Sequence, residues 1–338
     1  MQNPTAVLPV DFPGLRTHFL DGKVESRLER LRVEDLSPGE LVVRTMYAGV
    51  NYKDGLSIHG QAKIITEYPR VAGIELVGEV IESSTDDFRI GQVVLVHGFQ
   101  TGIAFDGGFA RYCRVPVAHA QALPQGLTPY EAAVIGVPGF TAAMALEHFE
   151  LCGIKPSAGP IAVSGAGGAV GLLAMGILSG AGYSVAAITR RTEFAPSLLS
   201  AGATEVIDAA VLDLPQRALE KARFSAAIDN LGGTMLSWLL RSMKDGGCVA
   251  CVGNASGNTY EGSVLPFIMR RIQLFGVMAN APWPQRRRLW ERLGKDLKPD
   301  FAKLLPHVKN IRLEQLMAHT ELQLKGQTSG RVLVSYED

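Results

Sequence analysis

A polar cluster near the start of the chain holds the first side chains that are able to do chemistry. Asn51, Tyr52, Lys53 and Asp54 follow directly after an expected strand that ends near residue 50. An aromatic hydroxyl beside amide, ammonium and carboxylate groups can hydrogen-bond a substrate and move a proton. Such clusters at the end of a regular element are often functional, so these four are candidate catalytic residues. Two structural roles stay open: Tyr52 closing a domain junction, and Lys53 with Asp54 forming an ion pair.

The glycines of a tight turn form the second candidate site. Gly165, Gly168 and Gly171 are spaced as GxxGxxG, a variant of the GxGxxG turn in which Val170 occupies the last glycine position. One glycine permits the turn, one lets the backbone approach a pyrophosphate, and one brings the next helix close to the sheet. The N–H groups and positive dipole end of that helix favour phosphate. An ordinary tight turn is the alternative, but a second apolar strand at 184–188 favours dinucleotide binding.

The end of that second strand predicts which dinucleotide is bound. An NAD site would place Asp or Glu here to hold the ribose 2′-hydroxyl, whereas this chain has Thr189, Arg190 and Arg191. Guanidinium groups pair with phosphate, and a carboxylate would repel it. The tip therefore predicts NADP, through its extra 2′-phosphate. Two solvated surface arginines are the alternative.

The elements that position the first cluster are predicted to be strands. Up to about residue 123 the chain consists of short apolar runs and turn signals, with no helix of consequence. Glycines alternate with apolar residues over 71–81, which is typical of bent, closely packed strands. The expected strands are 7–10, 40–43, 71–81 and 91–96. This part is therefore predicted to be a small bent β domain.

A helix is predicted to begin at Thr128. Pro129 follows it directly and Glu131 stands three residues on, which is the pattern of a capping box. The apolar helix 132–149 should follow, interrupted near 136–139 by glycine and proline.

The glycine turn is predicted to belong to a doubly wound parallel sheet. Strands and helices alternate after residue 160, and such alternation is typical of α/β folds. The expected strands are 161–163, 184–188, 206–207, 226–229, 248–252 and 272–278, and the expected helices are 193–201, 214–222, 235–243 and 285–295. A last strand, 330–336, should return to the first domain. Ligands of such sheets bind at the carboxyl ends of the strands.

Composition excludes several classes of function. The 338 residues include 33 basic and 33 acidic side chains, so no global field attracts nucleic acid or an anionic membrane. No run approaches the roughly 18 apolar residues of a membrane-spanning helix, and the first residues lack a signal pattern. We therefore expect a soluble cytoplasmic protein.

The cysteines predict neither a disulfide framework nor a metal site. Cys113, Cys152, Cys248 and Cys251 are few and scattered for a chain of this size. Only Cys248 and Cys251 are closely spaced, without a histidine or further cysteine to complete a zinc site. They are predicted to be buried core residues.

Several short segments, taken together and in order, carry a resemblance over essentially the whole chain. The segments are 51–54, 63–65, 106–108, 139–142, the glycine turn, 266–268 and 330–331. The chain resembles the zinc-free medium-chain dehydrogenase/reductases, and within them the acrylyl-CoA reductases and quinone-oxidoreductase-like proteins. Zinc-dependent members carry a GHE segment whose histidine binds metal, but Ile74 stands at that place here and the lobe of four cysteines is missing. No metal is expected.

The resemblance implies a fold of two domains. Residues 1–124 and 285–338 would form a GroES-like, bent β-barrel catalytic domain, and residues 125–284 a Rossmann domain that binds NADP. The active site would lie in the cleft between them, and a homodimer would form through the Rossmann domains.

The resemblance also implies a reaction. NADPH would deliver hydride to the β-carbon of an α,β-unsaturated acyl-CoA thioester, and hydrogen bonds would stabilise the resulting enolate in place of zinc. Tyr52 is the first choice for packing on the nicotinamide and donating a hydrogen bond, with Asn51, Lys53 and Asp54 nearby. The expected cofactor-binding residues are Tyr52, Ser164, Gly165, Gly168, Ala169, Val170, Gly171, Thr189, Arg190, Arg191, Asn254, Phe275, Val277 and Gln327.

Three functions stay open at this stage. The substrate is an acyl-CoA or, in the first alternative, a quinone. Arg270, Arg271 and the run 286–288 could meet the phosphates of coenzyme A, or the run could be a solvated helix face. In the second alternative the chain is a redox sensor that binds NADPH without catalysis, because a glycine turn predicts binding and not turnover.

Overall fold

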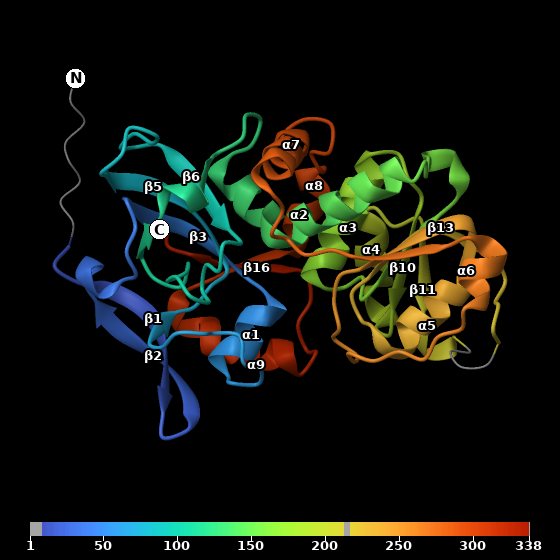
Figure 1. Cartoon of the computed structure of the whole chain (residues 1–338), viewed down its shortest axis with the longest axis horizontal. Helices are drawn as coiled ribbons and strands as arrows, with labels where there is room; N and C mark the ends of the chain where they lie inside the picture. The colour runs from blue at the N-terminus through green and yellow to red at the C-terminus, as the bar shows by residue number, and fades with distance from the viewer. Residues whose placement is uncertain (1–8, 213–216, 338) are drawn as a thin grey trace. The chain divides into compact units, whose positions relative to one another are not determined.

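The computed structural model describes residues 9–212 and 217–337 and divides the chain into two compact units (Figure 1). Unit 1 comprises the chain up to Val137 and again from Val308, and unit 2 comprises Pro138–His307. These boundaries differ from the predicted ones at both ends, because residues 125–137 belong to unit 1 and residues 285–307 belong to unit 2. There, Trp290 of helix α7 (Trp283–Leu293) stacks on Phe140 at a centroid distance of 5.9 Å.

Unit 1 is a β structure made of two sheets. The smaller sheet has the order β2-β1-β4, with β1 (Phe12–Leu20), β2 (Lys23–Leu31) and β4 (Arg70–Val71). The larger sheet has the order β15-β16-β3-β5-β6-β8, with β7 (Tyr112–Val115) also paired to β3. Its other strands are β3 (Leu41–Val50), β5 (Glu75–Ser83), β6 (Val93–His97), β8 (Ala120–Ala122), β15 (Val308–Ile311) and β16 (Arg331–Ser335). Two register shifts between β3 and β5 bend the sheet, as the glycine pattern predicts.

The last strand returns to the first unit, as predicted. β16 pairs antiparallel with β3, so that Leu333 lies opposite Gly49. The predicted strand 7–10 falls largely outside the described residues, and residues 9–10 are not in a strand.

The prediction of no helix before residue 123 is wrong at α1 (Tyr52–Ile58). The polar cluster itself starts this helix, because the backbone N–H of Asn51 donates to Oδ2 of Asp54 at 2.9 Å. Helix α9 (Leu316–Leu324) lies beside α1 (Figure 1), and Nε2 of His59, just after α1, is 2.9 Å from the Thr320 hydroxyl. Sequence reasoning missed α1 because seven residues are too few to show a helical period.

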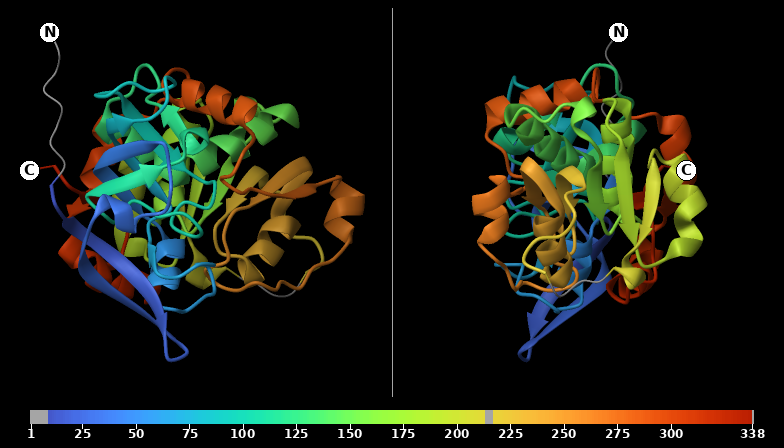
Figure 2. Two further views of the ribbon diagram at one scale, coloured as in Figure 1. Left: turned by 60° about the vertical axis from the view of Figure 1, so that its left-hand side comes forward. Right: turned by 90° about the vertical axis from the view of Figure 1, so that its right-hand side faces the viewer.

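Unit 2 contains the predicted doubly wound sheet. Its order is β11-β10-β9-β12-β13-β14, every pair is parallel, and helices cover both faces (Figure 2). The strands are β9 (Ile161–Ser164), β10 (Val185–Thr189), β11 (Glu205–Asp208), β12 (Phe224–Asp229), β13 (Met243–Cys251) and β14 (Gln273–Gly276). The main helices besides α7 are α3 (Ala169–Gly180), α4 (Ala195–Ser200), α5 (Gly233–Ser242), α6 (Leu265–Arg270) and α8 (Phe301–Leu304). β9 is entirely buried, as its uninterrupted apolar sequence predicts.

The predicted helix 214–222 is wrong where it can be judged. Residues 213–216 lie outside the described residues, and 217–222 form a bend and irregular backbone before β12.

Helix α2 (Pro129–Leu151) begins as predicted. The Glu131 backbone N–H donates to the Thr128 hydroxyl at 3.2 Å, and the Thr128 N–H donates to the Glu131 carboxylate at 2.8 Å. Gly136 interrupts the helix with φ 44° and ψ −153°, inside the predicted break. α2 is long and apolar enough to cross a membrane, but 83% of its most apolar window is buried inside the structure, as in a core helix.

Candidate functional site

The glycine turn has the geometry that its spacing predicts. Gly165 has φ +59°, a conformation that other residues rarely adopt. A Cβ on Gly171 would lie 2.6 Å from the backbone of Ala166, so only glycine lets α3 pack this closely against the turn. Gly168 precedes α3 and offers no capping side chain, so the first N–H groups of the helix are left for another acceptor.

The tip of β10 lies beside that turn. The Thr189 hydroxyl ends the strand by accepting a 3.1 Å hydrogen bond from the Arg191 backbone N–H. A Cβ built on Gly167 would stand 3.4 Å from Nη2 of Arg191, which places this guanidinium against the glycine turn. The same guanidinium lies 4.8 Å from the ring centre of Phe194, and Arg190 is exposed. Local cationic charge and the phosphate-type turn are thus brought together.

The side chain of Ser164, another predicted cofactor residue at this turn, points into the protein interior. It is fully buried, its hydroxyl donates to Asp229 at 2.6 Å, and it accepts from the backbone N–H of Asn230 at 2.9 Å. Ser164 therefore joins the turn to the end of β12 by hydrogen bonds. Burial raises the pKa of Asp229, against the hydrogen bond from Ser164 that lowers it.

Sequence reasoning missed Asp229 and Asn230 as parts of this site. The amide of Asn230 donates to the Ser164 carbonyl at 2.7 Å, and Asp229 also accepts the Gly232 N–H at 2.9 Å. The available signal was a carboxylate at the end of an apolar strand, which must find hydrogen-bond donors when it is buried.

The remaining predicted cofactor residues of unit 2 lie at or after the carboxyl ends of β13 and β14. Asn254 is exposed and hydrogen-bonds Asn258 in the loop after β13. The Val277 backbone N–H donates to the backbone carbonyl of Cys251 at 2.9 Å, and this bond joins the ends of the two strands. The half-buried ring of Phe275 packs against His148, with 3.7 Å between the ring centroids and 30° between the ring planes. Gln327 belongs to unit 1 and is exposed after α9.

The four candidate catalytic residues of unit 1 divide into two pairs. Asp54 is buried and accepts the backbone N–H groups of Asn51 at 2.9 Å and Ile74 at 3.0 Å. The Asn51 amide donates to Glu75 at 2.7 Å. Tyr52 is 39% exposed and Lys53 is exposed as well. Asn51 and Asp54 thus hold the start of α1, while Tyr52 and Lys53 face outward.

A buried ion pair supports this arrangement, and sequence reasoning missed it. Glu75 accepts from Nη2 of Arg331 at 2.8 Å and from the Val137 backbone N–H at 2.6 Å. Arg331 also donates to the carbonyl of Ala133 at 2.8 Å, and its side chain is fully buried. Gly49 and Gly136 make room, because a Cβ on either would collide with the Glu75 carboxylate. The available signal was a charged residue at the start of each of two largely apolar strands, β5 and β16.

Asp54 has an unusual proton affinity. Burial, together with the nearby Glu75 carboxylate, raises the pKa of Asp54 to about 7, although two backbone N–H groups favour its ionised form. Asp54 is therefore partly protonated near neutral pH.

The arginine clusters are engaged within unit 2. Arg270 donates to the carbonyls of Arg241 at 2.7 Å and Met243 at 2.9 Å. Arg271 pairs with Asp245, and Arg288 pairs with Glu147 at 2.9 Å. The triple arginine is not a uniformly solvated face, because Arg286 is buried between aromatic rings and burial lowers its pKa to about 10.

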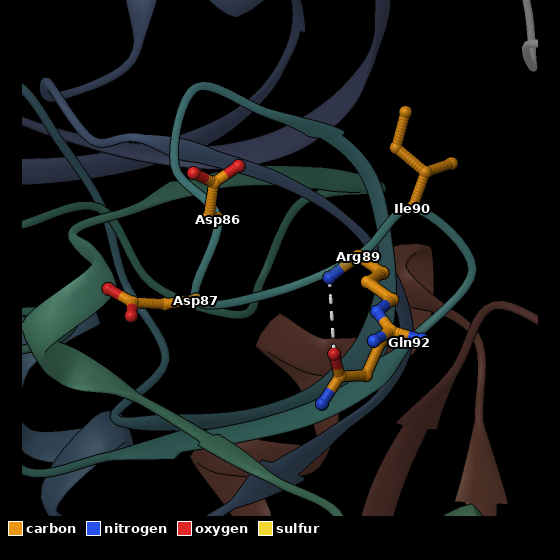
Figure 3. A pocket seen from close by; sticks show the side chains of 5 residues that line it. All are labelled: Asp86, Asp87, Arg89, Ile90 and Gln92. Carbon is orange, nitrogen blue, oxygen red and sulfur yellow. Dashed lines mark hydrogen bonds between the residues drawn. The ribbon is translucent and has the colours of Figure 1, made fainter.

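A surface pocket in unit 1 is separate from the residues above. It is lined by Asp86, Asp87, Arg89, Ile90 and Gln92, on the turn between β5 and β6 (Figure 3). The two carboxylates point apart in this view, and the Gln92 side chain accepts the Arg89 backbone N–H at 3.1 Å. None of the predicted site residues lines it.

No metal centre is present in the described parts of the chain. Over residues 9–212 and 217–337, no group of three or more His, Cys, Asp or Glu side chains is arranged to hold a metal ion. At the position where zinc-dependent relatives would carry a histidine, the backbone N–H of Ile74 binds Asp54 instead.

Comparison with known proteins covers both units. Residues 37–125 match the alcohol dehydrogenase GroES-like domain family, and residues 169–295 match the family described as zinc-binding dehydrogenase. The acrylyl-CoA reductase AcuI of Ruegeria pomeroyi is 38% identical over 315 residues, which cover 93% of this chain and 95% of that protein. YhfP of Bacillus subtilis, provisionally named a quinone oxidoreductase, is 36% identical over 326 residues, covering 96% and 98%.

Solved structures agree over nearly the full length. YhdH of Escherichia coli K-12, crystallised with NADPH, has a TM-score of 0.91 at 36% identity and covers 96% of this chain and 100% of its own. Bacillus subtilis YhfP, crystallised with NAD, has a TM-score of 0.91 at 35% identity and covers 97% and 100%. Both the predicted resemblance and the predicted fold class are confirmed. The chain belongs to the medium-chain dehydrogenase/reductase family, among the members that lack the zinc-binding group.

Proposed function

We propose that this protein is an NADPH-dependent reductase that transfers hydride to the β-carbon of an α,β-unsaturated acyl-CoA thioester such as acrylyl-CoA. The observation that carries the proposal is the Arg191 guanidinium, which lies against the glycine turn at a strand tip without a carboxylate. Similarity to the acrylyl-CoA reductase supports the proposed substrate, and similarity to the NADPH-bound YhdH supports the proposed cofactor.

The residues of unit 2 suit the cofactor. Ala169, Val170 and Gly171 begin α3, and their backbone N–H groups would bind the pyrophosphate above Gly165 and Gly168. Thr189, Arg190 and Arg191 would hold the 2′-phosphate by charge-assisted hydrogen bonds. Asn254 would bind the ribose or nicotinamide side, and the backbone of Phe275 and Val277 would meet the carboxamide. Gln327 is a weaker candidate. Ser164 supports the turn without touching the ligand.

Tyr52 is the residue of unit 1 proposed to act on the substrate. When bound, NADPH supplies the hydride for the β-carbon. The Tyr52 hydroxyl would donate a hydrogen bond to the thioester carbonyl, where negative charge develops as the enolate forms. Lys53 would add positive charge beside it. Asn51 and Asp54 serve as positioning residues, since their polar groups are engaged at the start of α1.

The rate of NADPH oxidation with acrylyl-CoA, compared at equal concentration with a simple quinone, tests the substrate. A large preference for acrylyl-CoA is expected. A quinone preference would make the chain a quinone oxidoreductase, the second candidate, which the similarity to YhfP favours. If NADPH binds but neither compound is reduced, the catalytic proposal fails and the redox sensor becomes the better description.

Replacing Tyr52 by Phe tests the catalytic assignment. The variant keeps the exposed ring and loses one hydroxyl, so kcat should fall about tenfold to a thousandfold with little change in NADPH affinity. Unchanged kcat would show that the hydroxyl does not stabilise the transition state.

We also propose a cytoplasmic homodimer built through unit 2. Val264, Ile268, Met269 and Met278 are 64–71% exposed on α6 and just beyond β14, an apolar patch suited to a second copy. Burial of α2 supports a protein that stays out of membranes. Sedimentation should give a dimer that Ile268→Lys converts to monomer. Leu151→Lys, at an equally exposed apolar residue elsewhere, should leave the dimer intact.

A further inference from the structure

Two cysteines that are distant in the sequence lie beside one another in unit 2. Cys152 follows α2 directly, and its thiol is 3.6 Å from Oε1 of Gln273. Gln273 begins β14 and pairs in register with Cys248 of β13. Side chains of paired residues on neighbouring strands stand on the same face of a sheet, so Gln273 leads from one thiol to the other. Besides burial, the nearby Cys152 side chain raises the pKa of the Cys248 thiol.

The two thiols differ in access. Cys152 is half-buried and its partner Gln273 is exposed, so a small oxidant in solvent can reach the Cys152 sulfur. Cys248 is buried, and burial raises its pKa to about 12, so it is a poor first target for oxidation. This pairing of an accessible thiol with a buried neighbour is the arrangement in which the second thiol can trap the oxidised first one.

The pair lies away from the residues proposed to bind the cofactor. Gln273 is the first residue of β14, whereas Val277 follows the end of the same strand. In a parallel sheet all strands run in the same direction, so the thiols are nearer the amino edge. The candidate cofactor residues lie toward or beyond the carboxyl edge, with Phe275 two residues after Gln273.

We propose that Cys152 and Cys248 form a redox modification site, at which a peroxide converts the two thiols into a disulfide. In the first step the Cys152 sulfur attacks one peroxide oxygen, the O–O bond breaks, and a sulfenic acid and water result. In the second step the Cys248 sulfur attacks the Cys152 sulfur, the S–O bond breaks, and hydroxide leaves with the Cys248 proton as water. Two thiols lose two electrons, and one hydrogen peroxide is reduced to two waters.

The disulfide would tie the end of α2 to β13. It would close a long loop of the chain and thereby restrict the unfolded state, so it should raise the thermal unfolding midpoint. Because the cofactor residues lie at the other edge of the sheet, NADPH affinity should not change. Oxidation would thus stabilise unit 2 without acting as an on–off switch.

Thiol counting after exposure of the full-length protein to hydrogen peroxide tests this site. The wild type should lose two of its four thiols and regain them with dithiothreitol, and unreduced peptide mapping should join the peptides of Cys152 and Cys248. The unfolding midpoint should rise with oxidation and fall again on reduction. Cys251→Ser, a neighbour on the same strand, should behave like the wild type.

Two variants should abolish the effect. Cys152→Ser changes a half-exposed residue and should keep the fold while preventing both the cross-link and the rise in midpoint. Cys248→Ala should leave Cys152 to proceed to sulfinic acid. A wild-type protein in which the Cys248 thiol persists after Cys152 has been consumed, in which Cys152 bridges two chains, or in which neither thiol reacts would overturn the proposal.

Discussion

In unit 2 the glycine turn and the strand tip beside it come from one contiguous segment, braced by Asp229 and Asn230, whereas in unit 1 the start of α1 is held by residues from distant parts of the chain. The glycine turn, α3 and the tip of β10 all fall within residues 161–191, and each follows from local spacing. The start of α1, by contrast, depends on Glu75 from β5 and on Arg331 from β16. The difference teaches that a binding turn can be built from one contiguous segment, while the proposed catalytic helix depends on the assembled unit.

Removing the distant support should have the largest effect. Arg331→Met would leave the Glu75 carboxylate buried without its cation, which typically costs about 3–5 kcal/mol of unfolding free energy. Denaturant unfolding measures this cost. Arg89→Met, at an exposed arginine of the same unit, should change stability by no more than about 0.5 kcal/mol. Similar costs for both variants would mean that unit 1 does not depend on the ion pair.

The protonation of Asp54 should give unit 1 a pH dependence. The pKa of Asp54 rises from 3.8 to about 7 on folding, so the native state binds a proton that the unfolded state has released. Its contribution to stability is full below about pH 4 and is lost as the pH rises through about 7. Between about pH 5 and pH 8, the wild type should lose about 2–3 kcal/mol relative to Asp54→Asn, which cannot titrate. Parallel pH curves for the two proteins would contradict the raised pKa.

Changes at the proposed cofactor site of unit 2 should alter its choice between dinucleotides instead of the stability of the protein. Replacing both Arg190 and Arg191 by Ala should weaken NADPH binding by about 1.5–3 kcal/mol, because charge-assisted hydrogen bonds to the 2′-phosphate are lost. Binding of NADH to the same variant is the internal control and should hardly change. Equal losses for both dinucleotides, measured by calorimetry, would mean that these arginines do not read the phosphate.

Two glycines at the turn, Gly167 and Gly171, differ in how closely their surroundings pack against them. Gly171→Ala would place a Cβ 2.6 Å from the Ala166 backbone and should destabilise the protein by about 1–3 kcal/mol. Gly167→Ala meets only the Arg191 guanidinium, at 3.4 Å, so its effect on folding should be smaller. Thermal unfolding of both variants measures the difference. Equal shifts of the two unfolding midpoints would argue against tight packing of α3 on the turn.

The same contrast explains what could be predicted from the sequence. The parallel sheet, the break at Gly136 and the strand character of β16 follow from apolar periodicity, capping residues and turn glycines, all of which act locally. Helix α1 and the roles of Glu75 and Arg331 were not found, because a seven-residue helix shows no period and a charged residue at the start of a strand does not reveal its partner. The sequence also could not show that the Ser164 hydroxyl donates to Asp229, since its position in the turn predicts only that it lies near the cofactor.

The return of β16 to β3 also determines the order in which the protein can be completed during synthesis. Residues 138–307 are contiguous, so the nascent chain can pair all six strands of that sheet before residue 331 has been made. β3 and β5 emerge from the ribosome much earlier, yet the carboxylate of Glu75 has no Arg331 to neutralise it until near the end of translation. The first segment to be made is therefore the last to fold completely. The start of α1, which positions Tyr52, is complete only when the chain is almost finished.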